Sequence, residues 1–406
     1  MTDQTDILVV GAGHAAGQLC VSLRQGGFEG SVTVIGEEPQ PPYQRPPLSK
    51  KFLAGELEAD RLWVKPQDFY AQAEIDLRTG TRVMSIDTEA KTASTDDGAS
   101  LSWRHLVLAT GTRIRPLPVP GTDLPGVFYL RTMNDVDAMR PHFTAGKKVV
   151  VVGGGYIGLE VAAVARGLEM DVDVVEQMPR LLSRVVSPMI SDFYAEVHQS
   201  AGVKLWLDKR VTGIVGDGKA EGVTLEDGTT LDADLVLIGI GVIPNDEIAS
   251  DAGITCSNGI DTDLYCRTSA DDVFAIGDCC NHPNEIYHRR IRLESVPNAL
   301  GQARTAAATI LGQDKPYSEV PWFWSDQYDL KLQIVGLTEG YDETVVRGDP
   351  ASRQFSCFYL KAGRLLAVDA INSPKEFMRS KALVAAHAEV PKSALADPSI
   401  DLKDFA

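Results

Sequence analysis

The stretch from Asp6 to Glu37 restricts the fold of this chain more than any other. The apolar run Ile7 to Val10 leads into Gly11-Ala12-Gly13-His14-Ala15-Ala16, and a helical pattern then leads to a second apolar run, Val32 to Ile35. This order predicts a strand, a glycine turn, a helix and a second strand, which together form a dinucleotide-binding unit. An ordinary strand-to-helix turn is the alternative, but here the whole unit is present.

Each small residue of this turn has a role in such a unit. Gly11 permits the tight turn, Gly13 lets the backbone approach a pyrophosphate, and Ala16 lets the helix pack closely on the strand. His14 and Ala15 open the helix, whose N-terminus faces the phosphates. The turn is therefore predicted to bind the diphosphate of a dinucleotide.

An acidic residue follows the second predicted strand. Glu37 is placed to accept hydrogen bonds from an adenosine ribose, although Glu38 beside it offers a second candidate. Further along, residues 106–112 have the pattern of a buried strand that ends in a glycine turn. The last residues of this pattern, Ala109, Thr110 and Gly111, are expected to contact a cofactor.

The same design recurs in the middle of the chain. Val149 to Val152 leads into Gly153-Gly154-Gly155-Tyr156-Ile157-Gly158, a full G-x-G-x-x-G, and a helical pattern leads on to Val172 to Val175 and then Glu176. Leu235 to Gly241 repeats the closing strand. Two copies within one chain are far harder to produce by chance than one. The chain is therefore predicted to bind two dinucleotides.

Composition excludes several classes of protein. A chain of 406 residues is too long for one core and predicts two or three domains. The formal net charge of -17 argues against nucleic acid as a partner. Asp3 and Asp6 stand where a signal peptide would be basic, and no apolar run approaches membrane-spanning length. The six cysteines match neither a disulfide framework nor a zinc site. We expect a cytoplasmic protein with reduced thiols, no metal and no membrane partner.

A proline-rich segment, Pro39 to Lys50, follows the first unit. Its prolines disfavour a regular helix and favour extended backbone, so the segment is predicted to be a loop or linker. Arg45, Ser49 and Lys50 would suit phosphate and ring contacts if the loop folded back over a bound nucleotide. A disordered linker is the alternative.

Several later patterns extend the first unit and add a third region. Alternating apolar residues in 75–86 and 101–103 predict antiparallel strands. Residues 273–278 predict a short buried strand that delivers the carboxylate of Asp278 at a turn, and residues 294–299 open a helix. The aromatic segment after Val320 begins an α+β region, which ends with a helix predicted from about Pro374 to His387.

These residues resemble the FAD-dependent NADH:ferredoxin reductases of bacterial haem monooxygenase and ring-hydroxylating dioxygenase systems over essentially the whole chain. The most specific segments are Pro46 to Lys50, Gly153 to Glu160, Ala275 to Asp278, Glu294 to Ala299 and Pro321 to Gln327. The resemblance implies an α/β fold like that of glutathione reductase, with Rossmann-like FAD and NAD domains and a C-terminal α+β domain. It implies FAD segments at 1–115 and 245–320, an inserted NAD domain at 116–244 and a C-terminal domain at 321–406.

The resemblance also implies roles for single residues. Asp278 resembles the carboxylate that binds the ribityl chain of FAD, and Val296 and Pro297 resemble the support of its ring. Lys50 and Glu160 resemble a pair beside the reactive flavin nitrogen, where a lysine stabilises the charge of the reduced flavin; a structural salt bridge is the alternative. The resemblance further implies cofactor contacts for Val83, Gly277 and Ser295, for Arg45 and Arg131, for Tyr156 near the nicotinamide, for Arg184 at the pyrophosphate, and for Trp324 near the flavin ring. Tyr156 and Trp324 could equally be packing residues.

The chain lacks the thiols of related disulfide reductases. Those enzymes carry a redox-active cysteine pair in the first helix after the FAD strand pair, where this chain has Pro46 to Lys50, and no cysteine lies between 20 and 256. Cys279 and Cys280 are expected to be small buried packing residues. Electrons that arrive as hydride are therefore expected to leave directly from the flavin.

We therefore expect NADH to reduce FAD, and the flavin to supply single electrons to a 2Fe-2S ferredoxin that serves an oxygenase. Glu176 is expected to select NADH because it repels a 2′-phosphate. Arg289, Arg290 and Arg292 are expected to dock an acidic ferredoxin, with solvation of a loop as the alternative. We expect a monomer. Rubredoxin, quinone or dioxygen is the alternative acceptor, and a redox-sensing flavoprotein like the apoptosis-inducing factors is the alternative class.

Overall fold

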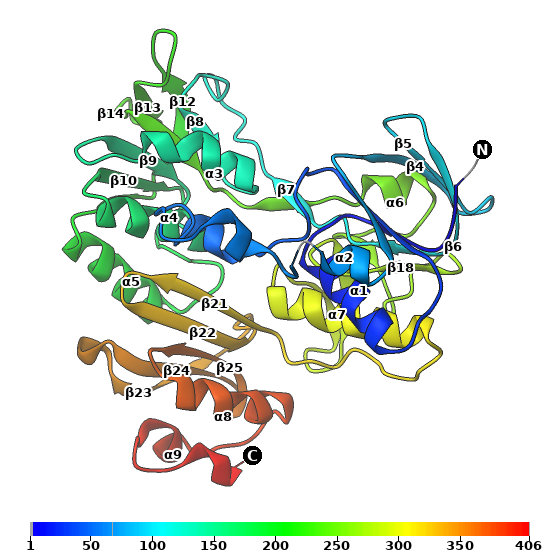
Figure 1. Ribbon diagram of the computed structural model, residues 1–406. Coiled ribbons are helices and arrows are strands. Elements are labelled where there is room, and N and C mark those ends of the chain that lie inside the picture. Colours follow the sequence, from blue (N-terminus) through cyan, green and yellow to red (C-terminus); the bar gives the residue numbers. More distant parts are fainter. Residues whose placement is uncertain (1–2, 67, 406) are drawn as a thin grey trace. The chain divides into compact units, whose positions relative to one another are not determined.

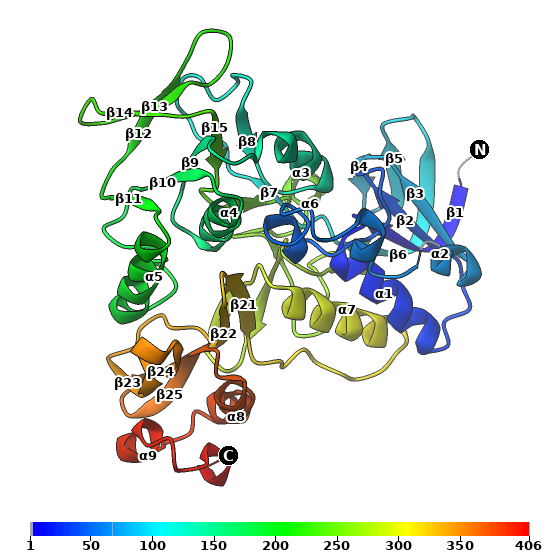
Figure 2. The same ribbon diagram turned by 60° about the vertical axis from the view of Figure 1, so that its left-hand side comes forward.

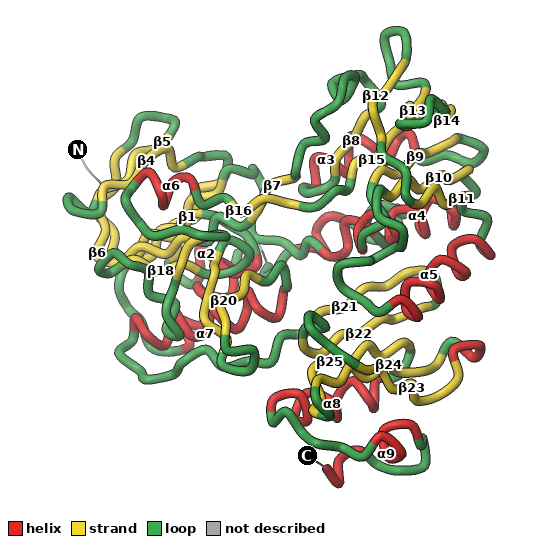
Figure 3. The backbone as a smooth tube through the Cα atoms, turned by 180° about the vertical axis from the view of Figure 1, so that it is seen from behind, coloured by secondary structure: helices red, strands yellow, loops and turns green. Residues whose placement is uncertain are grey.

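The computed structural model describes residues 3–66 and 68–405, and the chain divides into two compact units. Unit 1 comprises Met1–Gln44, Ala59–Arg113 and Ile243–Pro321. Unit 2 comprises Arg45–Glu58, Ile114–Val242 and Trp322–Ala406. Both units combine helices with strands, as an α/β fold requires (Figure 3).

Unit 1 is built on a sheet packed against α1 (His14–Gln25) and α7 (Val296–Ile310), two helices that lie side by side (Figures 1 and 2). Ile7 and Val9 join both helices in one core, whereas Leu8 belongs to a second core on the other face of the sheet. In spatial order the strands are β3 (Ile75–Thr79), β2 (Val32–Gly36), β1 (Asp3–Val10), β6 (Ser100–Leu108), β5 (Thr92–Thr95) and β4 (Val83–Asp87), and β18 (Val273–Ala275) also pairs with β6.

Two details of this sheet differ from the expectation. β3 pairs with β2 in parallel, because the chain returns through α2 (Phe69–Gln72) and makes a crossover instead of a hairpin. The apolar stretches at 101–103 and 106–108 form one strand, β6, which pairs in parallel with β1 and antiparallel with β5. The alternation of side chains had indicated strands but not their directions.

The remaining elements of unit 1 are short. They are η2 (Ala59–Leu62), α6 (Glu247–Asp251), and a small sheet of β17 (Ile260–Asp261), β19 (Cys280–Asn284) and β20 (Arg289–Arg292). The chain passes between the units within β7 (Thr112–Ile114) and β16 (Val242–Pro244).

Unit 2 contains a second sheet whose strands are all parallel, as expected for a repeated strand–helix–strand design. In spatial order these strands are β11 (Lys204–Leu207), β10 (Asp171–Glu176), β9 (Lys148–Val152), β15 (Leu235–Ile238) and β8 (Val127–Tyr129). Its helices are α3 (Met133–Met139), η3 (Arg140–His142), α4 (Tyr156–Gly167) and α5 (Pro188–Ser200), and a small antiparallel sheet consists of β12 (Val211–Val215), β13 (Gly222–Leu225) and β14 (Thr230–Asp232).

The proline segment is not extended throughout. Pro46–Ser49 forms a short 3-10 helix, η1, with both prolines in its first positions, where a missing N–H costs no hydrogen bond. Leu48 and Ser49 are buried. The turn therefore fixes the backbone that carries Lys50.

The C-terminal residues of unit 2 form an antiparallel sheet and several helices. The sheet has the order β21 (Trp322–Gln327), β22 (Leu330–Gly336), β25 (Arg364–Ile371), β24 (Gln354–Lys361) and β23 (Glu343–Asp349). The helices are α8 (Pro374–Ala385), α9 (Lys392–Ala396) and η5 (Leu402–Phe405), and η4 (Pro350–Ser352) joins two strands. The expected last helix thus begins at Pro374 and ends at Ala385, before His387.

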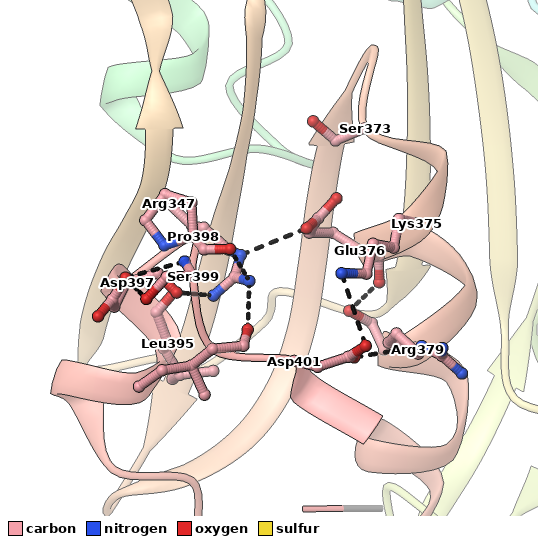
Figure 4. A network of polar contacts seen from close by, with 12 residues as sticks. Arg347, Ser373, Lys375, Glu376, Arg379, Leu395, Asp397, Pro398, Ser399 and Asp401 are labelled. Atoms are coloured by element: carbon pink, nitrogen blue, oxygen red, sulfur yellow. Dashed lines mark hydrogen bonds and ion pairs between the residues drawn. The ribbon is translucent and has the colours of Figure 1, made fainter. Parts of the chain in front are cut away.

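A buried arginine holds the end of the chain against this sheet (Figure 4). Arg347 on β23 is 3% exposed and forms an ion pair with Glu376 of α8 at 3.3 Å. Its guanidinium also donates to the backbone carbonyls of Ala394, Leu395, Asp397, Pro398 and Ile400. Nearby, Lys375 and Arg379 pair with Asp401. Arg347, which no sequence pattern marks, therefore makes several of the contacts that fix the segment after α8.

Within the described residues, no helix combines the length and the apolar character needed to cross a bilayer.

Candidate active site

The first glycine turn leaves room for a phosphate group. Gly11 has φ 104°, and a Cβ there would lie 2.2 Å from the carbonyl oxygen of Ala109, so only glycine fits. At Gly13, by contrast, no atom lies within 4 Å of the place of a Cβ. The N-cap of α1 is Gly13, which has no side chain that could cap the helix. The open space at Gly13 and the uncapped helix N-terminus together fit the pyrophosphate of a dinucleotide.

The Gly277–Asp278 turn lies at the same end of α1. Gly277 has φ 83°, and a Cβ there would lie 3.3 Å from Ala15 of α1 and 3.8 Å from Ala299 of α7. The Gly277 amide donates to Gln302 of α7 at 2.7 Å, and the partly buried Asp278 follows. The structure therefore brings the first turn, Asp278 and the start of α7 together, as a wrapped FAD requires.

The other residues expected at this site belong to the same unit. Ser295 is the buried N-cap of α7, Val296 opens the helix, and Pro297 is buried in its first turn. Val83 is buried in β4. Thr110 donates to the Asn245 carbonyl at 2.6 Å, which fixes the loop that continues to Gly111. Their roles toward FAD stay predictions.

The second glycine turn repeats this geometry. Gly153 has φ 113°, and a Cβ there would lie 2.4 Å from the Gly239 carbonyl oxygen, whereas the space at Gly155 is open. A Cβ at Gly158 would lie 2.2 Å from the Gly153 carbonyl oxygen, so this residue must be glycine for α4 to pack. Gly241 adopts φ 102° between β15 and β16. These residues fit a second dinucleotide.

The two units differ at the ribose position. In each, the first glycine of the turn donates its amide to the second strand at 2.8 Å; the pairs are Gly11 with Ile35 and Gly153 with Val175. The next residue is Glu176 in unit 2 but Gly36 in unit 1, where a Cβ would lie 2.5 Å from the Ala12 Cβ. Glu37 therefore lies one position beyond the place that Glu176 occupies. The Glu37 carboxylate is exposed and lies 3.8 Å from Arg82.

Glu38 and two arginines have neighbours that limit their freedom. Glu38 accepts a hydrogen bond from Tyr43 at 2.5 Å, whereas Arg184 is exposed after β10. Arg45 donates to the Arg131 carbonyl at 2.7 Å, so these two expected anchors are neighbours within unit 2. The structure thus brings Arg45 and Arg131 together.

Lys50 and Glu160 form a buried ion pair. The Lys50 ammonium lies 2.7 Å from Oε2 of Glu160, and the two side chains are 17% and 4% exposed. Lys50 also donates to the Pro46 carbonyl at 3.1 Å. Ser49 donates to the same Oε2 at 2.5 Å, and Ser325 of β21 donates to Oε1 at 2.6 Å. A buried carboxylate with these partners holds one ammonium in a fixed place.

Aromatic side chains lie beside this pair. The Tyr156 ring packs on Phe323, with ring centroids 4.9 Å apart. The Tyr156 hydroxyl is buried and has no hydrogen-bond partner within residues 3–66 and 68–405, and burial raises the pKa of Tyr156 well above its usual value. Trp324 is half-buried, and its ring centroid lies 5.7 Å from that of Trp322. Ile157 at the start of α4 is exposed. Packing on Phe323 therefore holds the Tyr156 ring.

β21 explains why Ser325 was missed. Along this strand Phe323, Ser325 and Gln327 point to one face and contact Tyr156, Glu160 and His198, whereas Trp322 contacts Phe377 of α8. The alternation of side chains in WFWSDQ could have indicated that Ser325 and Gln327 share a face with Phe323, but only the aromatic residues of this segment were interpreted. The strand thus carries polar positions of the site that the sequence interpretation did not name.

The thiols are placed for packing. Cys279 and Cys280 are fully buried and free, and burial raises the pKa of both, to about 12 for Cys280. Among residues 3–66 and 68–405 there is also no group of three His, Cys, Asp or Glu side chains that could hold a metal. The expected packing role of the two cysteines fits this geometry.

β20 separates the three arginines. Arg290 donates to the carbonyls of Thr262 and Asn281, and Arg292 pairs with Glu294 at 2.9 Å and donates to the Asp278 carbonyl at 3.2 Å. The Arg292 side chain is only 11% exposed. Because side chains alternate along a strand, Arg289 points to the face opposite Arg290 and Arg292. The three arginines do not form one continuous positive surface.

Two dinucleotide cradles together with a fixed lysine–glutamate pair define a flavin-dependent reductase that uses a pyridine nucleotide. The chain belongs to the pyridine nucleotide-disulphide oxidoreductase family, whose match covers residues 5–303, and residues 322–406 match the reductase C-terminal family. Members of this group use FAD and NAD(P)H. Despite the family's description, residues 46–50 of this chain contain no cysteine.

Individual relatives cover nearly the whole chain. The ferredoxin reductase subunit of 5,5'-dehydrodivanillate O-demethylase from Sphingobium sp. is 44% identical over 98% of each chain. Putidaredoxin reductase of Pseudomonas putida is 42% identical over 100% of this chain and 97% of its own. The crystal structure of a covalent putidaredoxin reductase–putidaredoxin complex matches with a TM-score of 0.96 at 42% identity, over 99% of this chain and 98% of that one. The expected group of ferredoxin reductases is thereby confirmed.

Proposed function

We propose that this chain accepts hydride from NADH on bound FAD and delivers the electrons singly to a 2Fe-2S ferredoxin of an oxygenase system. The observation that carries the proposal is the Lys50–Glu160 pair, which fixes an ammonium in a family member without redox thiols. Bound FAD supplies the chemistry that divides a two-electron input into one-electron outputs. The chain's own residues bind, orient and electrostatically support that group.

Lys50 would stabilise the negative charge of the reduced cofactor, because a fixed ammonium needs no reorganisation as charge develops. Glu160 keeps this ammonium in place through the 2.7 Å contact. Tyr156 would cover the nicotinamide side and shift when NADH binds. Within the described residues its hydroxyl has no hydrogen-bond partner, so this shift would disrupt the packing on Phe323 but no hydrogen bond of the hydroxyl.

Glu176 supports a preference for NADH. Its two carboxylate oxygens accept hydrogen bonds from the backbone amides of Gly154 at 2.7 Å and Met178 at 2.8 Å. These bonds would hold a negative charge at the ribose position. A 2′-phosphate would meet this charge, and the exposed Arg184 would serve the pyrophosphate. Asp278 and the first turns of α1 and α7 would hold FAD.

The ferredoxin is proposed to dock at Arg289 and its neighbours, and the protein to act as a monomer in the cytoplasm. Because the net charge is -17, most of the surface repels an acidic partner. An exposed arginine is then a local site of attraction for that partner. All six cysteines are free, as in a reducing compartment. Size-exclusion chromatography with light scattering tests the monomer.

Stopped-flow reduction of the FAD-loaded protein by NADH tests the proposed role of the pair. Lys50→Ala should slow flavin reduction by about tenfold or more, whereas Lys51→Ala at the neighbouring exposed position should not. Ferredoxin, rubredoxin and a quinone are then compared as acceptors of the reduced protein. Faster reduction of rubredoxin or quinone than of every ferredoxin tested would replace the proposed acceptor.

A further inference from the structure

A chain of hydrogen bonds runs from an exposed tyrosine to the buried Glu160. Tyr328 Oη lies 3.1 Å from His198 Nδ1, and His198 Nε2 lies 2.9 Å from Gln327 Oε1. Gln327 Nε2 lies 3.2 Å from Ser325 Oγ, which lies 2.6 Å from Glu160 Oε1. All five residues belong to unit 2. This series of hydrogen bonds ends on the Glu160 carboxylate, which holds Lys50.

The donors and acceptors in this chain can be arranged in one direction. The Glu160 carboxylate only accepts, so Ser325 must donate its single proton to it and accept from the Gln327 amide. The Gln327 oxygen then accepts from His198 Nε2, and the neutral ring accepts from Tyr328 at Nδ1. Burial lowers the pKa of His198, which favours this neutral ring. Every donor therefore points toward Glu160.

The two oxygens of Glu160 have different partners. Oε2 faces Lys50 and Ser49, whereas Oε1 faces only Ser325 among the contacts of the described residues. The orientation of a carboxylate is fixed when both oxygens are held. Loss of the Ser325 donor would leave a buried charged oxygen without a partner, and the carboxylate would rotate to share the donors at Oε2.

We propose that Ser325, Gln327 and His198 are positioning residues that orient the Glu160 carboxylate and thereby hold the Lys50 ammonium for hydride transfer. This inference rests on the proposed function of the Lys50–Glu160 pair. The three residues are 0%, 1% and 0% exposed, so their geometry is set by packing and not by solvent. Ser325 contacts Glu160 directly, and Gln327 and His198 act through it.

The first test compares substitutions at Ser325. Ser325→Ala should slow flavin reduction by NADH by about tenfold, the scale of one lost hydrogen bond to a charged group, with little change in the dissociation constant of NADH. Ser325→Thr keeps the hydroxyl and should restore most of the rate. Ser356→Ala is the matched control, because this serine on β24 is also buried but has no hydrogen-bond partner within the described residues.

The second test reverses the polarity of the chain. Gln327→Glu keeps the side-chain volume but replaces the amide donor by a second carboxylate oxygen facing Ser325 Oγ. The Ser325 proton then has two competing acceptors. Flavin reduction should slow at least as much as in Ser325→Ala. The FAD content of each purified variant separates this effect from misfolding.

Crystal structures of the wild-type protein and of Ser325→Ala provide a readout besides activity. The Glu160 carboxylate should be rotated in the variant, with a longer distance from Oε2 to Lys50. An unrotated carboxylate, or normal flavin reduction in both Ser325→Ala and Gln327→Glu while Lys50→Ala is slow, would overturn the positioning role. Normal reduction in Lys50→Ala would instead overturn the proposed function of the pair, and this inference with it.

Discussion

Glu176 and Gly154 are joined by a hydrogen bond of 2.7 Å between the carboxylate at the end of β10 and an amide of the glycine turn. This bond fixes a negative charge beside the turn that would bind the diphosphate. Glu176→Gln should therefore lower the preference for NADH over NADPH by about tenfold or more, since the repulsion of a 2′-phosphate is lost. Steady-state kcat/KM values for both cofactors measure this change.

Glu196→Gln, on the exposed face of α5, removes the same charge away from the turn and should leave the preference unchanged. Equal kcat/KM values for NADH and NADPH in the wild-type protein would contradict the role of Glu176.

The two adjacent cysteines should be dispensable for electron transfer. Burial raises the pKa of the Cys280 thiol to about 12, so a reactive thiolate is rare at neutral pH. The variant with both Cys279 and Cys280 replaced by serine should reduce ferricyanide with NADH at a nearly normal rate, provided that FAD remains bound. Its stability should fall by about 1 to 2 kcal/mol, because buried hydroxyls replace well-packed thiols. Lost turnover at full flavin content would restore a redox role to these thiols.

Arg289 and Arg292 of β20 should have different roles, because they point to opposite faces of the strand. Arg289→Glu should raise the KM for an acidic ferredoxin by roughly threefold to tenfold at low salt and flatten its salt dependence. Arg292→Glu should mainly weaken FAD binding, because Arg292 donates to the Asp278 carbonyl. Arg210→Glu, an exposed position in unit 2, controls for net charge. An unchanged salt dependence in Arg289→Glu would place the docking surface elsewhere.

Arg347 should be essential for the order of the C-terminal segment. Arg347→Lys keeps the charge but cannot reach five carbonyls at once, so several buried acceptors lose their donor. We expect a loss of about 3 kcal/mol in stability and faster proteolysis after Lys392. Limited trypsin digestion with mass spectrometry locates the cleavage. Arg364→Lys, at an exposed ion pair, is the control and should be neutral.

Asp369 should make stability depend on pH. It is fully buried on β25, Oδ2 accepts from Tyr359 at 2.5 Å, and burial raises the pKa of Asp369 to about 7. The folded state therefore binds the proton more tightly than the unfolded state, and this stabilisation is lost as pH rises from about 4 through about 7. Asp369→Asn should be more stable than wild type above pH 7, by on the order of 4 kcal/mol.

Denaturation of both proteins at pH 5 and pH 8, with saturating FAD, measures this difference. A stability gap that is the same at both pH values would show that Asp369 does not titrate as expected.

The sequence predicted what depends on local spacing. Gly11, Gly153 and Gly158 lie where backbone geometry requires glycine, so their spacing alone identified both turns. Lys50 and Glu160 are 110 positions apart, and only a family resemblance paired them. Local sequence also misleads at the ribose position. Gly36, and not Glu37, occupies the position in unit 1 that corresponds to Glu176 in unit 2.

Contacts to the backbone were beyond any pattern of side chains. Arg347 lies in a strand like many surface arginines, and its five carbonyl partners come from a segment that begins 47 positions later. Every residue has a backbone carbonyl, so a sequence motif cannot indicate which carbonyls an arginine contacts. Gln327 and His198 meet only after β21 and α5 pack within the same unit.

The alternation along β21 has a consequence for how this protein tolerates changes in length. Phe323, Ser325 and Gln327 serve one face of the strand and the two tryptophans the other, so a shift of one residue would exchange the two sets at once. A shift by one residue would bring Trp324 or Asp326 to Glu160 and Asp326 or Tyr328 to His198, and it would turn the Ser325 hydroxyl and the Gln327 amide away. Length in this strand is therefore constrained more tightly than most of its individual side chains.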